Sequence, residues 1–214
     1  MKENRNAGFT LVEIMIAMLM MLIIITSVGQ FMSASSINYQ AVDNQVNMQM
    51  EAQNTINTIC DMVLEANNVA YEKIDGEEYF FIYKNLGELD SKGNPLTKAN
   101  ALQNVIWLDK TNCNLYLFVC NNAVERLDAI DKGKHTRKKL LAEGVANWSF
   151  STATGAATVA LTEKGLKSDA FSNNPTLTIT VNFQAQVGVG GKKDGYTYSA
   201  TDSVSPRSQI VEIA

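Results

Sequence analysis

The amino-acid sequence predicts an α+β fold, in which one long N-terminal helix packs on an antiparallel β-sheet head. Three observations predict it. An apolar run with almost no charge begins at Phe9, and helical spacing of apolar residues continues towards Asn68. From Val69 onward, short segments rich in aromatic and β-branched residues alternate with turn residues, which is typical of strands. One helix followed by many strands is the element order of an α+β protein.

The first half of the expected helix, residues 9–36, is long and apolar enough to span a membrane. Between Phe9 and Val42, Glu13 is the only charged residue. A hydrocarbon core about 30 Å thick needs about 20 apolar residues as a helix. We therefore expect one membrane span in this segment, and no later segment of the chain is comparable.

The basic residues Lys2 and Arg5 precede the apolar run. The positive-inside rule places such residues in the cytoplasm. We therefore expect a single-pass precursor in the cytoplasmic membrane, with the remainder of the chain outside the cytoplasm.

The second half of the expected helix, residues 37–68, is amphipathic. Its apolar residues recur at three- and four-residue steps, which favours one buried stripe against the head. The stripe consists of Val42, Val46, Ile56, Cys60 and Val63. Gly29 and the serines near it could allow a bend, and Asn67-Asn68 is a plausible end. One helix from Phe9 to Asn68 would be roughly 90 Å long.

The head, residues 69–214, is predicted to be β-rich. The expected strands are Glu78–Tyr83, Val105–Leu108, Asn114–Val119, Val145–Phe150, Leu177–Phe183, Tyr196–Val204 and a last short one at Ile210–Ile213. Val105–Leu108 and Asn114–Val119 are expected to form a hairpin around residues 109–112. Leu177–Phe183 and Tyr196–Val204 are expected to pair across a loop at Gly188–Gly195. Residues 86–101 are expected to form a loop, because they carry strong turn signals.

The N-terminus does not have the order of an ordinary secretory signal. Its apolar stretch is too long, and the small residues Ala7-Gly8 come before that stretch rather than after it. Glu13 is also unexpected, because a carboxylate in a lipid-facing helix is costly and calls for a partner. The alternative is that Glu13 lies near the interface and its carboxylate reaches the headgroups.

The run Gly8-Phe9-Thr10-Leu11-Val12-Glu13-Ile14 resembles the class III leader junction of type IV prepilins and type II secretion pseudopilins. The resemblance implies that residues 1–8 are a leader peptide. A prepilin peptidase would cut between Gly8 and Phe9 and N-methylate Phe9. It also implies that Glu13 meets the terminal amine of a neighbouring subunit in a filament, where each charge would offset the cost of the other.

Later segments are similar to the larger minor subunits of that family, the J-type pseudopilins and W-type minor pilins. The similarity lies in Lys139–Phe150 and in the closing stretch Val204–Ser208. It implies a minor subunit that helps prime assembly or sits at or near the tip of a pilus, competence pilus or type II secretion pseudopilus. Its partners would be the prepilin peptidase, other pilin or pseudopilin subunits and the membrane.

The chain has three cysteines, Cys60, Cys113 and Cys120. An exported head could hold a disulfide. If residues 113–120 form one strand, the Cα atoms at its ends lie about 23 Å apart, too far for a bridge. Cys60 could pair with either of the others, and free thiols are equally compatible with the sequence.

The sequence contains no recognisable catalytic constellation. We find no G-x-S-x-G, H-E-x-x-H or P-loop pattern, so we expect no enzyme. With one histidine, His135, and no close cysteine pair, we expect no metal site and no cofactor. The net charge of −4, with scattered Lys and Arg, gives no footprint for nucleic acid.

The sequence is compatible with three functions. The leading one is a filament subunit that acts by interaction. The second is a membrane-anchored binding module that never polymerises, and the third is an anchored enzyme. Dependence on prepilin peptidase separates the first two, and a hydrolase screen of the head would test the third.

Overall fold

The computed structural model describes residues 10–98, 100–131, 138–154, 157–166, 175–189, 192–207, 210 and 213. The chain divides into two compact units, Met1–Gln45 and Val46–Ala214, and the boundary falls within helix α1, Leu11–Leu64.

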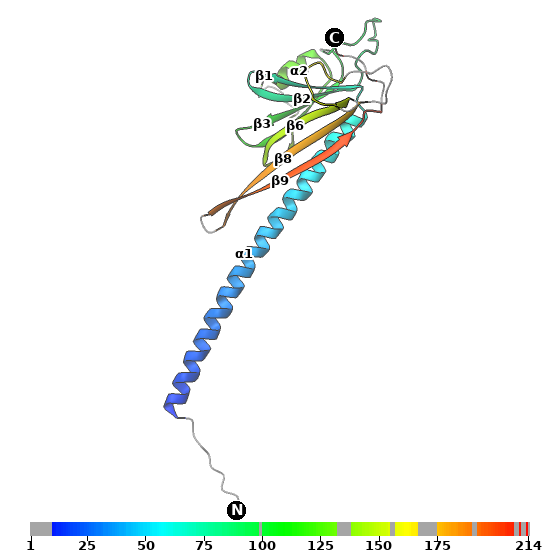
Figure 1. The fold of residues 1–214 in the computed structure, drawn as a ribbon. Helices are drawn as coiled ribbons and strands as arrows, with labels where there is room; N and C mark the ends of the chain where they lie inside the picture. The colour runs from blue at the N-terminus through cyan, green and yellow to red at the C-terminus, as the bar shows by residue number, and fades with distance from the viewer. Residues whose placement is uncertain are drawn as a thin grey trace, which may run out of the picture. The chain divides into compact units, whose positions relative to one another are not determined.

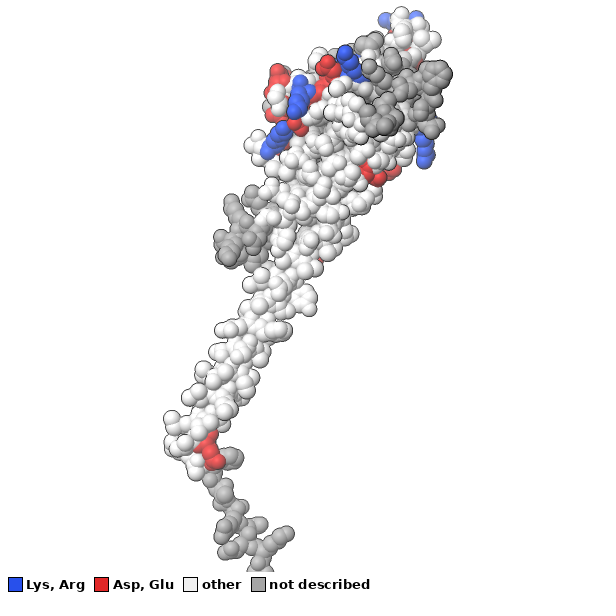
Figure 2. Space-filling view, viewed as in Figure 1, with Lys and Arg blue, Asp and Glu red and all other residues white. Residues whose placement is uncertain are grey.

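The described part of the first unit is helical, and its large apolar side chains are exposed. Figure 2 shows this part of α1 as an almost entirely white, uncharged surface. The helix runs without interruption through Gly29 and Ser33, so no break is seen where a bend was considered. Here the Thr26 and Ser27 hydroxyls donate to Ile23 O at 2.9 and 2.8 Å, so they need no outside partner. Among the described residues, α1 alone is long and apolar enough to cross a membrane.

The second unit combines the end of α1 with two antiparallel sheets and a short helix (Figure 1). The first sheet has the order β1-β2-β3-β4-β5, and the second sheet has the order β7-β6-β8-β9. The strands are β1 Asn68–Ile74, β2 Glu77–Tyr83, β3 Gln103–Asp109, β4 Asn114–Cys120, β5 Lys139–Ala142, β6 Val145–Thr154, β7 Ala157–Ala160, β8 Thr176–Val189 and β9 Lys192–Val204; helix α2 is Ala123–Ile130. The prediction of an α+β fold with a long N-terminal helix is confirmed.

The alternating segments of the sequence form the expected strands. The hairpin across residues 109–112 is β3 paired with β4, from Gln103 opposite Cys120 to Asp109 opposite Asn114. The strand pair predicted around Leu177–Phe183 is β8 with β9. Their pairing continues to Val189 opposite Lys192, so most of the expected loop at 188–195 is strand instead. Of the last expected strand, 210–213, only Ile210 and Ile213 are described, and neither is in a strand.

The helix ends at Leu64, and Asn68 is the first residue of β1, so the expected helix end at Asn67-Asn68 was wrong by about one turn. The physical reason is that both asparagines make buried, strand-like contacts. Asn67 donates its side-chain amide to Leu86 O at 2.7 Å, and its Oδ1 accepts from Leu86 N at 3.3 Å. Asn68 makes the same pair of contacts with the backbone of Leu166, at 3.1 and 2.9 Å.

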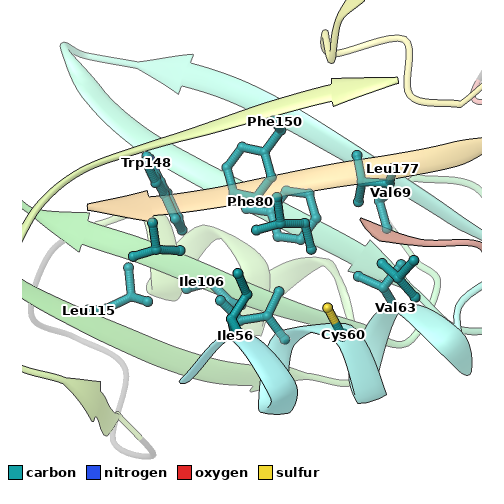
Figure 3. Close-up of a cluster of buried hydrophobic side chains, with 14 of the residues drawn as sticks. Ile56, Cys60, Val63, Val69, Phe80, Ile106, Leu115, Trp148, Phe150 and Leu177 are labelled. Carbon is teal, nitrogen blue, oxygen red and sulfur yellow. The ribbon is translucent and has the colours of Figure 1, made fainter. Parts of the chain in front are cut away.

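The larger of two buried apolar clusters in the second unit lies between the two sheets and the last four turns of α1. Ala52, Ile56, Ile59 and Val63 of α1 are fully buried there. Figure 3 shows Ile56, Cys60 and Val63 turned towards side chains from both sheets, including Phe80 and Phe150, whose rings stack at 4.1 Å. The predicted stripe is confirmed over Ile56, Cys60 and Val63. It was wrong at Val42 and Val46, which are 58% and 45% exposed, because Met48 and Ala52 provide the next buried turn.

Glu78 of β2 joins the two sheets by a buried carboxylate. Its side chain is 8% exposed, and Oε1 accepts from Lys110 at 2.8 Å. Oε2 accepts from the indole nitrogen of Trp148, on β6, at 2.9 Å. Burial alone would raise the pKa of this carboxyl, but the hydrogen bonds from Lys110, Lys73 and Trp148 hold it below its usual value. The ionised form is therefore favoured in the folded head.

Because the folded pKa of Glu78 is depressed, its contribution to stability is present above about pH 4.3, the unfolded pKa of Glu. It is lost as the pH falls through the lower folded pKa. We expect the Glu78→Gln chain to be less stable at pH 7 and to lose less stability than the unchanged chain below pH 4. Urea unfolding followed by tryptophan fluorescence at pH 7 and pH 3 measures this. Parallel stability curves for the two chains would contradict it.

All three cysteines are free. Cys60 and Cys120 are buried, and Cys113 is partly exposed. Burial, together with Asp202, whose Oδ2 lies 3.8 Å from the Cys60 sulfur, raises the pKa of the Cys60 thiol to about 12. Cys60 is therefore a protonated, unreactive thiol at neutral pH.

We expect native chain treated with a maleimide at pH 7 to be modified first at Cys113. Cys60 and Cys120 should react only after unfolding in urea. Peptide mass spectrometry of the labelled chain provides the measurement, with the Cys113→Ser chain as control. Modification of Cys60 at the rate of Cys113, or a disulfide-linked peptide, would contradict the structure.

Candidate functional site

The site residues expected from the sequence lie at the beginning of the chain. Gly8 and Phe9 lie outside the described residues. Glu13 is described and lies in the first turn of α1. The structure therefore describes one of the three expected site residues, together with its neighbour Thr10.

Glu13 and Thr10 form a reciprocal pair of hydrogen bonds at the start of α1. The backbone N–H and the hydroxyl of Thr10 each donate to Glu13 Oε2 at 3.0 Å. In return, the Thr10 hydroxyl oxygen accepts from Glu13 N at 3.3 Å. This is a capping box, in which the side chain of each residue accepts a hydrogen bond from the backbone N–H of the other.

The capping box was missed in the sequence, although its signal is present there. Thr10-x-x-Glu13 directly before an apolar run is the pattern of a capping box. It gives Glu13 a local role, because a carboxylate in the first turn also interacts favourably with the helix dipole. A partner in another subunit is therefore not needed to explain why an acid stands at this position in the isolated chain.

The arrangement still leaves Glu13 able to accept a second partner. The Thr10 contacts that are described use Oε2 and leave Oε1 without a contact to Thr10. A carboxylate oxygen accepts more than one hydrogen bond. Glu13 can therefore keep its own helix cap and accept a bond from a cationic group that approaches the helix start.

Two open grooves flank the second half of α1 within the second unit. One is lined by Cys60, Asp61, Asp202 and Ser203 and the other by Glu51, Asn54 and Leu141, among other residues. Glu51 in the second groove accepts a hydrogen bond from Glu143 N at 2.8 Å, which ties α1 to the β5–β6 turn. In the part of the chain that the structure describes, no three His, Cys, Asp or Glu side chains are placed to bind one metal ion.

The comparison with protein families matches the start of the chain. Residues 4–29 match the family model described as the prokaryotic N-terminal methylation motif. No curated protein and no solved structure matches the chain. The matched segment includes Gly8, Phe9 and Glu13, and it supports a type IV pilin or pseudopilin with a class III leader.

The fold agrees with this assignment. A long apolar N-terminal helix whose later turns pack on antiparallel sheets is the architecture expected of a pilin. The leader motif and the apolar helix together support anchoring in a membrane. Pilins form a structural rather than an enzymatic family.

Proposed function

We propose that the chain is a minor pilin or pseudopilin, a structural subunit of a type IV filament that helps prime assembly or sits at or near the tip. The observation that carries the proposal is the methylation motif at residues 4–29. A long apolar helix that leads into a separate β-rich head supports it.

In this proposal, residues 1–8 are a leader that prepilin peptidase removes between Gly8 and Phe9, and Phe9 is then N-methylated. Residues 9–36 form the membrane-spanning and filament-core half of the helix. Residues 37–68 connect it to the head, and residues 69–214 form most of the head outside the cytoplasm. The function is interaction with other subunits, and no catalytic activity or cofactor is required.

The proposed role of Glu13 follows from chemistry at the cut. Cleavage creates an α-amino group at Phe9, whose reference pKa of about 7.7–8.0 makes it largely cationic at neutral pH. An amine and a carboxylate are both costly in an apolar surrounding, and each offsets the cost of the other when they pair. The amine of one subunit and Glu13 of its neighbour would therefore select one register of helix packing.

A minor rather than a major subunit is proposed because of the head. It combines two sheets with a long loop between β2 and β3, whereas a major subunit must repeat closely along a fibre. The short helix α2, with Val124 and Leu127 exposed at 66% and 63%, adds a further irregular surface.

The test of this function is recovery of the chain in filaments. We expect the chain to appear, at low abundance, in filaments sheared from the surface of cells or assembled beneath the outer membrane. The second candidate, a non-polymerising anchored binding module, predicts that all of the chain stays in the membrane fraction. That result in cells that assemble filaments normally would reject the proposal.

A further inference from the structure

Helix α2 covers the face of the first sheet that points away from α1. The alternate residues Tyr79, Phe81 and Tyr83 of β2 lie on this face, in the second and smaller of the two buried clusters. The Arg126 guanidinium of α2 lies 4.8 Å from the centre of the Phe81 ring. Ile130 O, at the end of α2, accepts from the Tyr79 hydroxyl at 2.9 Å. The helix therefore closes this face of the sheet.

Polar side chains are buried beneath α2 among these apolar ones. Tyr83 of β2 and Gln103 of β3 stand directly opposite one another, so their side chains are neighbours on the covered face. Both residues are 0% exposed. Arg126 reaches the same face from α2 and Glu72 from β1, and these two are paired at 3.5 Å. We call Glu72, Tyr83, Gln103 and Arg126 the α2 polar cluster.

Several buried atoms of the α2 polar cluster have no hydrogen-bond partner among the described residues. They are the Tyr83 hydroxyl, Arg126 Nε and both polar atoms of the Gln103 amide, Nε2 and Oε1. A buried polar group without a partner costs the full free energy of removing it from water. Most buried polar side-chain atoms in proteins are therefore bonded to protein or to ordered water. The unpartnered atoms of three neighbouring side chains point to a bound ligand between α2 and the sheet.

The charges of the cluster act on the Tyr83 hydroxyl. Burial raises the pKa of Tyr83, the positive charge of Arg126 lowers it, and the negative charge of Glu72 raises it. The hydroxyl is therefore protonated at neutral pH and available as a donor. Glu72 is already paired with Arg126 and with Lys98 of the β2–β3 loop. Its carboxylate is occupied by these two cations, so it is not the missing partner of Tyr83 or Gln103.

From these observations we propose that ordered water binds between α2 and the first sheet, held by Tyr83, Gln103 and Arg126. The water accepts from the Tyr83 hydroxyl, Arg126 Nε and Gln103 Nε2, and it donates to Gln103 Oε1. A buried water typically makes about three hydrogen bonds, so a small number of molecules satisfies the whole set. The water links α2 to β2 and β3. The inference does not depend on the proposed function in a filament.

The chemistry of the unpartnered atoms selects water over other ligands. Arg126 Nε and Gln103 Nε2 can only donate, whereas Gln103 Oε1 can only accept. An anion would satisfy the donors and leave Oε1 without a partner. A metal cation would be repelled by the Arg126 charge and would leave the N–H donors unsatisfied. An apolar ligand would satisfy none of these atoms, and water alone among these ligands both donates and accepts.

Hydroxyl-radical labelling of the full-length chain in detergent micelles tests the proposal. An X-ray pulse makes radicals from bound as well as bulk water, so a buried side chain beside a bound water is oxidised in place. Tyr79 is the matched control, because it lies on the same face of β2, is 1% exposed and has Ile130 O as the partner of its hydroxyl. We expect Tyr83 to be oxidised at least about threefold more than Tyr79, because the bound water lies beside its hydroxyl. Peptide mass spectrometry measures the oxidation of each tyrosine.

Removing the Gln103 amide should remove the water. We expect Gln103→Met, which keeps the length of the side chain, to lower oxidation of Tyr83 about threefold and to leave Tyr79 unchanged, because an apolar side chain does not hold water. Thr178→Val in the second sheet is the control and should change neither tyrosine. Equal oxidation of Tyr79 and Tyr83 in the unchanged chain would overturn the proposal, because it results when α2 lifts from the sheet or when no water is bound. That comparison needs no substitution, so it stands even if Gln103→Met does not fold. Oxidation of Tyr83 that persists in a folded Gln103→Met chain would also overturn the proposal.

Discussion

The chain with Glu13→Gln is expected to be cleaved and methylated normally, yet to enter filaments about tenfold less than the unchanged chain, because a lost charge leaves its partner unpaired. Glutamine keeps the shape of the side chain, and a capping box accepts Glu or Gln at this position. Its side chain can therefore still accept from Thr10, but it cannot neutralise the amine of a neighbouring subunit. Immunoblots of sheared filaments against the membrane fraction measure incorporation.

Thr10→Ala is the matched control for Glu13→Gln. It removes the hydroxyl that bonds Glu13 but keeps the carboxylate charge. If Glu13 acts through charge, Thr10→Ala enters filaments nearly normally and Glu13→Gln does not. If Glu13 only caps its own helix, the order is reversed, and the proposed role in assembly is wrong.

The second large effect is expected at Gly165. This residue has φ +69°, in the left-handed region, and it lies in the turn that approaches the start of β1. A Cβ atom there would lie 2.6 Å from Asn68 Oδ1 and 2.7 Å from the carbonyl oxygen of Val69. The carbonyl belongs to the backbone of β1 and cannot move away without disturbing the strand.

We therefore expect Gly165→Ala to lower the free energy of unfolding of the head by about 3 kcal/mol or more, the sum of left-handed strain and a backbone clash. The Asn68 side chain would also lose its paired contacts with Leu166, 3.1 and 2.9 Å long in the structure. Urea unfolding of the full-length chain in detergent micelles, followed by tryptophan fluorescence, provides the value.

Gly93→Ala separates the two causes. Gly93 has φ +80°, but no atom lies within 4 Å of the position of a Cβ. This variant should carry only the conformational strain, about 1–2 kcal/mol. Equal losses in Gly93→Ala and Gly165→Ala would show that the close approach to β1 contributes nothing.

The strands with clear alternation could be predicted from the sequence. Four apolar residues of β8 alternate strictly with polar residues, and in the structure they are buried in the core. They are Leu177, Ile179, Val181 and Phe183. The polar residues between them lie on the opposite face of the strand and are half-buried. The alternation fixed the strand and its two faces, but the pairing order of the sheets depends on contacts distant in sequence, which no local pattern contains.

The elements that were missed are short or contradict their local preference. Asn68 has low strand propensity. The strand β1 nevertheless begins there, because the Asn68 side-chain amide bonds to both the carbonyl oxygen and the N–H of Leu166. Helix α2 was missed although Asn122 caps it by accepting from Glu125 N at 2.9 Å. The pattern Asn122-x-x-Glu125 has the same spacing as Thr10-x-x-Glu13, and both capping signals could have been recognised in the sequence.

The candidate site could be predicted only as far as local sequence determines it. The positions of Gly8, Phe9 and Glu13 follow from a short motif, and the family comparison covers the same residues. The bonds between Glu13 and Thr10 within one chain were missed, although the Thr10-x-x-Glu13 pattern signals them. The structure shows a local role for Glu13, and the role in assembly remains a proposal to be tested.

The most direct test of the assignment is intact mass and N-terminal sequencing of the chain expressed with and without a prepilin peptidase. We expect a peptidase-dependent product that begins at N-methylated Phe9, and an uncut chain that retains Met1 to Gly8 when the peptidase is absent. An uncut chain in both cases would contradict the proposed filament-subunit function and would make the protein a simple membrane anchor.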